Sequence, residues 1–150
     1  MSNRKSSIQT VLASTLAAEM RAIFRKLKLR AREHGRRDDL TSSQIAVVLR
    51  LEKDGVATVS SLARTEGMRP QSMRAIVTPL QEAGLVRGAP DPNDGRQTLI
   101  SLTPKCLKGL KEGRAARQDW LTATISEKLS APEQKKLQAT LELLARLVEE

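Results

Sequence analysis

The residues best suited to chemistry in this chain cluster within residues 68–82, behind a proline that suits the first turn of a helix. Arginine, glutamine and hydroxyl side chains recur there with helical spacing. These candidates are Arg69, Gln71, Ser72, Arg74 and Thr78, and Ala75 is included as a small residue on the same face. An arginine can pair with guanine through two hydrogen bonds and a glutamine with adenine, while hydroxyls can reach bases or phosphates. The segment is therefore a candidate for reading a nucleic-acid groove. The alternative is an ordinary solvated helix surface.

A second candidate group is the sequence DPNDGR at residues 91–96, which is dense in turn-forming residues. It separates two short stretches of strand character, at residues 85–87 and 98–102, so we expect a small hairpin with a projecting tip. Asp91 and Asp94 are not expected to be a catalytic pair, because a loop-tip aspartate more often caps a turn. Arg96 is the candidate for contact with a partner, and the alternative is a simple ion pair with Asp94.

Four further positions carry weaker signals. Ser60 and Ser61 begin a short helix, where they could touch phosphates or could simply cap the helix. Cys106 lies early in another helix, where a thiol pKa can be lowered, although a lone cysteine is more often simply packed. His34 lies at a helix end beside a basic loop, and nothing in the sequence assigns it a role.

Composition excludes several classes of site. The chain has 150 residues, which suits one domain, and a single cysteine and a single histidine. These counts exclude an internal disulfide, a multi-cysteine metal site and a paired-histidine site. We expect no cofactor, no metal and no enzymatic activity, because no phosphate loop or nucleophile–base pair is present. No apolar run is long enough to cross a membrane, so we expect a soluble cytoplasmic protein.

The spacing of apolar residues predicts a mainly helical fold with a small β-hairpin. Long amphipathic helices are expected at residues 6–34, capped by Ser6 or Ser7, and at 103–129 and 130–148. Between them, helices are expected at residues 41–54, 58–67 and 70–83, and the last two make a helix-turn-helix. Ile45, Val48, Leu49 and Leu51 are the expected buried residues of the first of these three helices. Gly109 and Gly113 should each cost a helix about 1 kcal/mol relative to alanine, unless a close approach offsets it.

Charge is unevenly distributed along the chain. The formal net charge is +9, which suits a polyanionic partner, although many basic surfaces bind none. Residues 1–40 hold ten Lys/Arg against four Asp/Glu, whereas residues 41–104 hold seven against six. The helix and hairpin proposed to read nucleic acid therefore do not coincide with the most basic part of the sequence.

The segments at residues 40–55, 60–86 and 91–105, taken in order, resemble the MarR family of winged helix-turn-helix transcription regulators. The most specific piece is DPNDGR followed by a strand and Leu102-Thr103, which is similar to the family's wing. The resemblance implies a winged helix-turn-helix at residues 40–102 within one domain. It also implies dimerisation helices at residues 6–34 and 103–150.

The resemblance further implies a recognition helix in the major groove and a wing along the minor groove. Arg96 matches the wing arginine that enters the minor groove, and Asp94 matches the aspartate that holds it. Family members commonly repress genes until a small-molecule effector binds. This chain departs from many members by carrying Ala89, Pro90 and Gly95 around the tip, where basic residues are common.

We therefore expect a homodimeric repressor that reads a palindromic operator in double-stranded DNA, with a small-molecule effector as a further partner. Two alternatives stay open. One is a sequence-tolerant architectural nucleic-acid-binding protein, which a specificity ratio near one would favour. The other is a winged-helix module that binds protein instead of DNA.

Overall fold

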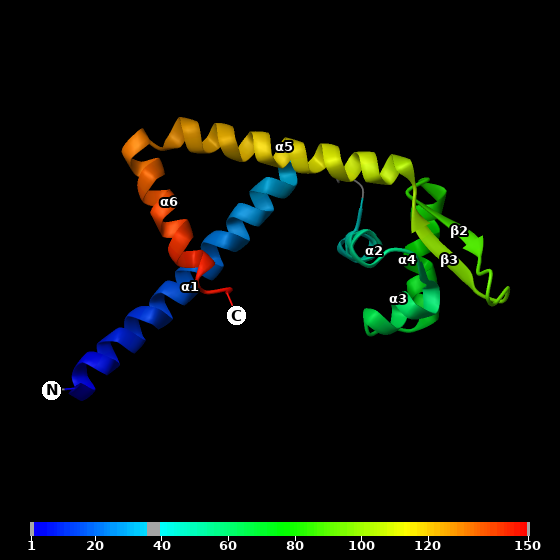
Figure 1. Ribbon diagram of the computed structural model, residues 1–150, viewed down its shortest axis with the longest axis horizontal. Coiled ribbons are helices and arrows are strands. Elements are labelled where there is room, and N and C mark those ends of the chain that lie inside the picture. Colours follow the sequence, from blue (N-terminus) through cyan, green and yellow to red (C-terminus); the bar gives the residue numbers. More distant parts are fainter. Residues whose placement is uncertain (1, 36–39, 150) are drawn as a thin grey trace. The chain divides into compact units, whose positions relative to one another are not determined.

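The computed structural model describes residues 2–35 and 40–149, with side chains from residue 8 onward (Figure 1). The elements in chain order are α1 (Ser2–His34), α2 (Ser42–Asp54), β1 (Ala57–Thr58), α3 (Val59–Thr65), α4 (Pro70–Glu82), β2 (Val86–Pro90), β3 (Thr98–Leu102), α5 (Pro104–Lys128) and α6 (Ala131–Ala145). The expected fold class, mainly α with a β-hairpin, is confirmed.

The chain forms two compact units. One, here called the head, comprises the described residues of 36–114 and contains α2 to α4, the sheet and the start of α5. The other, here called the helical unit, comprises the described residues of 1–35 and 115–150. Helix α5 belongs to both, with residues 104–114 in the head and 115–128 in the helical unit.

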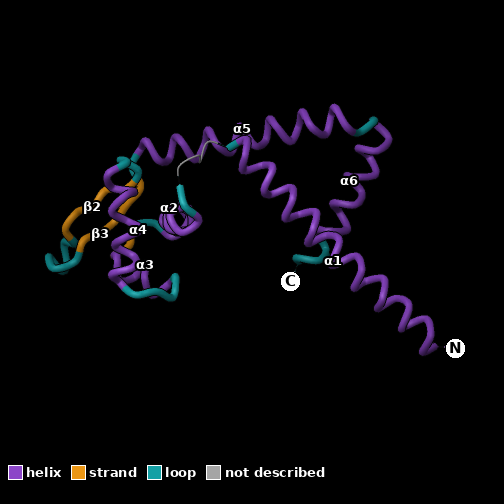
Figure 2. The backbone as a smooth tube through the Cα atoms, turned by 180° about the vertical axis from the view of Figure 1, so that it is seen from behind, coloured by secondary structure: helices purple, strands orange, loops and turns teal. Residues whose placement is uncertain are grey.

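The head contains a three-stranded antiparallel sheet in the order β1-β3-β2, shown as orange strands in Figure 2. Ala57 pairs with Ile100 across β1 and β3, and Arg87 pairs with Ser101 across β2 and β3. The sequence prediction had two strands and missed β1. A two-residue strand is too short to show the alternation by which strands are recognised, and here pairing with β3 defines it.

The core of the head is built around one face of α4. Met73, Val77 and Leu80 of this helix are buried, with Met73 and Leu80 fully inaccessible to solvent. They belong to a cluster that includes Val48, Leu62 and Ile100 from α2, α3 and β3, and also Cys106 and Leu110 from α5. The spacing of α4's buried residues leaves its opposite face free.

Several predicted details are wrong. Helix α1 begins at Ser2, ahead of the expected cap at Ser6 or Ser7, since no proline or glycine interrupts residues 2–7. Leu49 is 37% exposed, and Val47 is buried in its place because the inward face of α2 is centred on Val47, Val48 and Leu51. Strand β2 runs further toward the hairpin tip than expected, to Pro90. Helix α6 ends at Ala145, which leaves Val148 82% exposed.

Helix boundaries in the head follow local signals. Thr41 caps α2 in a capping box with Gln44, as the sequence predicted. Helix α3 is capped by Thr58, the first residue of the helix expected at residues 58–67. Gly67, in the turn between α3 and α4, has a φ of +64°, a left-handed conformation that glycine adopts without strain. These signals fix the angle at which α4 leaves α3.

Candidate nucleic-acid interface

The outward face of α4 gathers the candidate reading residues. Gln71, Ser72, Arg74, Ala75 and Thr78 are all exposed, because Met73, Val77 and Leu80 occupy the inward face. Arg69 is the N-cap residue and is also exposed. Its side chain makes no capping hydrogen bond, and Pro70 follows in the first turn.

The Arg74 side chain is free to bind a partner. Within the described part of the chain, no hydrogen bond or ion pair engages its guanidinium group or the Gln71 amide. An arginine held at its base by a rigid helix, with its five N–H donors unused, is suited to a bidentate contact with a base edge. The geometry of α4 therefore supports groove reading, with Gln71 and Thr78 on the same face.

The hairpin tip is ordered by its two aspartates. Asp94 Oδ1 accepts a hydrogen bond from the Arg96 backbone N–H at 3.1 Å, and Asp91 Oδ1 accepts one from the Asn93 N–H at 2.8 Å. The Gln97 N–H donates to the Asp94 carbonyl at 2.9 Å. Both aspartates therefore cap turns, as the sequence predicted, and neither is arranged as a catalytic acid.

Asp94 holds Arg96 through the backbone and not through the side chain. Among the described residues, no carboxylate lies within ion-pair distance of the Arg96 guanidinium, which is exposed. The alternative of a simple ion pair with Asp94 is therefore wrong for this structure. The tip presents a free cationic side chain on a backbone that its neighbours hold in place.

Ser60 and Ser61 lie exposed in the first turn of α3. The Thr58 hydroxyl accepts a hydrogen bond from the Ser61 N–H at 3.1 Å, so Thr58 caps the helix and the two serines do not. The Thr65 hydroxyl donates to the backbone carbonyl of Ser61 at 3.0 Å, so this contact does not involve the Ser61 hydroxyl. Both serines are therefore placed where hydroxyls can meet phosphates.

Ion pairs that sequence reasoning missed support these elements. Arg50 of α2 donates to Glu66 at the end of α3 and to Asp54, each at 3.3 Å, and these hydrogen bonds, first the one to Glu66 and then the one to Asp54, raise the pKa of Arg50. Arg114 of α5 forms a two-pronged pair with Glu52 of α2, which raises the pKa of Arg114. Glu66 and Glu52 are distant in sequence from their arginines, so no local spacing signalled these two pairs, whereas Asp54 lies four residues after Arg50 on the same helix.

The C-terminal end of α4 is tied to the start of α5. The Lys105 ammonium donates to the Ala83 carbonyl at 2.8 Å, and the Thr103 hydroxyl donates to the Gly84 carbonyl at 2.7 Å. A cation near the last carbonyls of a helix is favourable because of the helix dipole. The first turn of α5 therefore caps the helix that carries the candidate reading residues.

Cys106 and His34 do not belong to this interface. Burial, and secondarily the charge of Glu52, raise the pKa of the Cys106 thiol, so Cys106 is a packed cysteine, as was favoured from the sequence, and not a thiol with a lowered pKa. His34 stacks on Trp120 with ring centroids 4.7 Å apart, and its Nδ1 donates to the Arg30 carbonyl at 2.8 Å. Both contacts lie within the helical unit.

Residues 2–35 and 40–149 contain neither a candidate metal-ion cluster nor a candidate membrane span. No group of three or more His, Cys, Asp or Glu side chains is arranged to hold a metal ion there. No helix in the described ranges is long and apolar enough to span a bilayer.

The chain resembles known proteins in both its sequence and its fold. The model of the MarR family matches residues 40–98. The chain is 32% identical to the HTH-type transcriptional regulator Mb0904 of Mycobacterium bovis, over 93% of this chain and 94% of that protein.

Solved structures of other proteins share the fold of this chain. The transcriptional regulator Tm0710 from Thermotoga maritima superposes with a TM-score of 0.73 at 19% identity, over 89% of this chain and 94% of that one. The F27L mutant of MepR from S. aureus, bound to an oligodeoxyribonucleotide, superposes with a TM-score of 0.67 at 20% identity, over 89% and 98%. At these identities the superpositions establish the fold.

Proposed function

Because the chain belongs to the MarR family of winged-helix transcriptional regulators, we propose that it is a cytoplasmic homodimer that represses genes by binding a palindromic operator. The observation that carries this proposal is the outward face of α4. Gln71, Arg74 and Thr78 stand exposed on a helix whose other face is locked into the core. Such a helix can enter a major groove without a change in the structure of the head. Arg69 and Ser72 would then lie near the DNA phosphate backbone.

The hairpin formed by β2 and β3 is the proposed wing. Its tip carries Arg96 with a free guanidinium on a backbone held by Asp94. An arginine is attracted into a narrow minor groove by the negative potential there. Ser60 and Ser61, at the start of α3, are proposed to contact phosphates. The wing and α3 would then position the head, while α4 discriminates between sequences.

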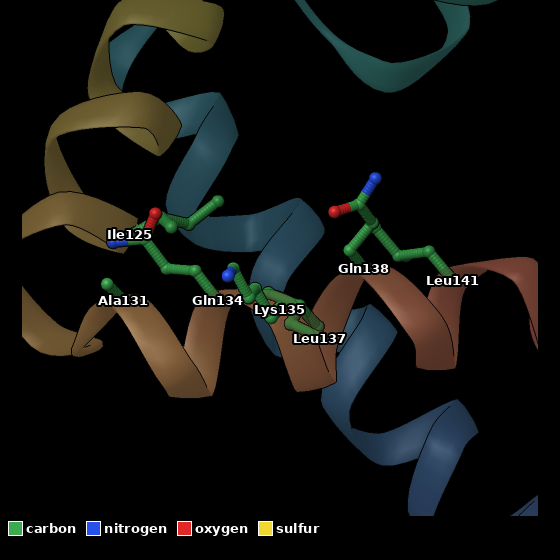
Figure 3. A pocket seen from close by; sticks show the side chains of 7 residues that line it. All are labelled: Ile125, Ala131, Gln134, Lys135, Leu137, Gln138 and Leu141. Atoms are coloured by element: carbon green, nitrogen blue, oxygen red, sulfur yellow. The ribbon is translucent and has the colours of Figure 1, made fainter.

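Dimerisation is proposed to occur through the helical unit. Large apolar side chains of α1, namely Ile8, Val11, Leu12, Leu16, Ile23, Phe24 and Leu27, are between 41% and 66% exposed. A groove on α5 and α6, seen in Figure 3, adds Ile125, Leu137 and Leu141. Contiguous apolar surface of this kind marks a protein interface, and a second copy offers the same surface in return.

An effector would act by changing which dimers can bind. Two heads must be spaced to enter successive major grooves, about one helical turn apart. A small molecule that binds better to dimers with another spacing would lower the population able to hold the operator. Helix α5 supports this idea, because one continuous helix contributes to the core of the head and to the helical unit.

The proposal is tested with three single variants of the full chain on a selected operator and on random duplex. Arg74→Ala should lose roughly 1–3 kcal/mol of operator binding and relax base choice. Arg96→Ala should weaken binding to both duplexes, with less effect on base choice. Lys136→Ala on α6 removes the same charge and should leave selectivity intact. Unchanged selectivity in Arg74→Ala would refute the role of α4.

The dimer is tested separately by sedimentation of the full chain at micromolar concentration, with and without operator. We expect a dimer in both cases. A monomer that persists with DNA present would rule out the proposed architecture, because one head spans only one half-site.

A further inference from the structure

The densest run of basic residues in this protein lies on a helix that makes no DNA contact in the proposed function. Residues 41–104, with the proposed reading helix and wing, hold seven Lys/Arg against six Asp/Glu. Residues 21–32 of α1 contain six Lys/Arg and no Asp/Glu. The net charge of +9 is therefore carried largely outside the proposed reading surface.

Four of these cations share one face of α1, the long blue helix of Figure 1. Arg21, Arg25, Lys28 and Arg32 follow one another at intervals of four, three and four residues, which places them within an arc of roughly 60° on a helix that turns about 100° per residue. They span about 16 Å along the axis at 1.5 Å per residue. We call these four residues the cationic ridge.

The ridge lies away from the apolar side of the same helix. Leu16, Ile23 and Leu27 are centred about 150° around the helix from the ridge, by the same rotation per residue. Val11 and Phe24 lie nearer to it, each about 70° from its centre. The ridge stays outside a contact centred on the Leu16, Ile23 and Leu27 side, and the proposed function then requires the second copy to pack on that side. The ridge inference rests on the proposed function in this one respect.

The ridge cations have no acidic partner in the described chain. All four side chains are exposed, and no carboxylate of residues 8–35 or 40–149 lies within ion-pair distance of any of them. Arg30, off the ridge, does pair with Glu33 at 3.4 Å. Like charges at these spacings destabilise a helix by roughly 0.2–0.5 kcal/mol per pair. A bound polyanion would remove that repulsion.

We propose that the cationic ridge binds the phosphodiester backbone of duplex DNA without reading its sequence, as a site additional to the winged head. Duplex DNA carries a charge about every 1.7 Å along its axis, so each ridge cation finds a phosphate. Three of the four are arginines, which grip phosphate through two parallel hydrogen bonds. Single strands are less suited, because they are held by stacking on aromatic rings and the whole chain has one Phe, one Trp and no Tyr.

The test measures how binding to a long random duplex depends on salt, in a full-chain background carrying Arg74→Ala and Arg96→Ala. This background removes the two arginine contacts proposed for α4 and the wing, so the ridge contributes a larger share of the binding that remains. The ridge variant is Arg25→Gln with Lys28→Gln. The matched control is Lys108→Gln with Lys136→Gln, which removes the same charge from exposed positions on α5 and α6. Glutamine suits a helix interior, so folding is retained.

The ridge variant should reduce the steepness of log affinity against log salt concentration by about 1.8. This corresponds to binding up to roughly 60-fold weaker near 0.1 M salt. The control variant should change this slope little. Equal losses in both pairs would mean that only net charge matters, and no loss in either would mean that the ridge binds nothing. Both results overturn the inference. So would loss of the dimer in the ridge variant, or ridge-dependent binding to anionic lipid vesicles instead of duplex.

The head's own role is scored in a separate arm without the Arg74→Ala and Arg96→Ala changes. If that protein binds a selected operator no better than random duplex, the proposed function fails. The salt slopes of the ridge variant and its control can still be compared in that case. The two ideas therefore fail independently.

Discussion

Replacing Gly109 by alanine is expected to stabilise the head, whereas the same replacement at Gly67 is expected to destabilise it. The two sites are matched in space, because a methyl group added at either would meet no atom within 4 Å. They differ in backbone conformation. Gly109 lies inside helix α5, while Gly67 has a φ of +64° in the turn that leads into α4.

The magnitudes follow from this difference. Alanine is better than glycine in a helix interior by about 0.8–1.0 kcal/mol, and nothing at Gly109 opposes that gain. At Gly67, alanine restricts the unfolded chain, which favours folding by about 0.4–1 kcal/mol. A left-handed conformation costs it about 1–2 kcal/mol. The two variants should therefore differ in free energy of unfolding by roughly 2 kcal/mol.

The assay is urea unfolding followed by circular dichroism, at one fixed chain concentration because association contributes to apparent stability. The wild type should fall between the two variants. If Gly67→Ala is as stable as Gly109→Ala, the argument that the turn before α4 requires a left-handed residue is wrong. Because that turn sets the path into α4, Gly67→Ala should also weaken operator binding, which Gly109→Ala should not.

Three other predictions concern the core, the thiol and a helix cap. Leu80→Ala, at a fully buried position of α4, should lower the free energy of unfolding by about 2–5 kcal/mol in the same assay, and a loss well below that range would mean that the site is not tightly packed. Burial raises the pKa of the Cys106 thiol, so iodoacetamide should label folded protein far more slowly than urea-unfolded protein at the same pH; comparable rates would contradict the burial. Hydrogen bonds from the Ser130 side chain and backbone hold the pKa of Glu133 below its usual range. Because this pKa is lowered, the stability contributed by Glu133 is present above its unfolded-state pKa and is lost as pH falls through its folded-state pKa. Ser130→Ala removes the hydroxyl donor and keeps the backbone N–H, so the pKa of Glu133 in an NMR titration should rise part of the way toward the ordinary carboxyl range, and an unchanged pKa would contradict the role of the hydroxyl.

Sequence alone predicted the elements whose determinants are local. Both capping boxes, Thr41 with Gln44 and Ser130 with Glu133, occur at the predicted helix starts because each is completed within four residues. Strand β3 has the predicted bounds, since its five residues alternate in character. The exposure of Gln71, Arg74 and Thr78 followed from the spacing of α4's buried residues.

Features that depend on tertiary contacts were not predicted. Strand β1 exists through its pairing with β3, and its two residues carry no pattern of their own. Burial of Cys106 against the head core opposes the effect of a helix start on its pKa, and position in the helix does not reveal that burial. Whether a close helix approach offsets the cost of Gly109 was left open by the sequence, and in the structure the space beside Gly109 is open. Ties such as Lys105 to Ala83 and Arg114 to Glu52 join residues that only folding brings together.

The central claim is that α4 and the wing of two paired heads read a symmetric DNA sequence. Selection of duplexes from a random pool by the full chain tests it most directly. The account predicts an enriched palindrome whose half-sites are separated by about one helical turn, and its loss when Arg74→Ala is used in the selection. Enrichment of no sequence, or of the same sequence by wild type and Arg74→Ala, would contradict it.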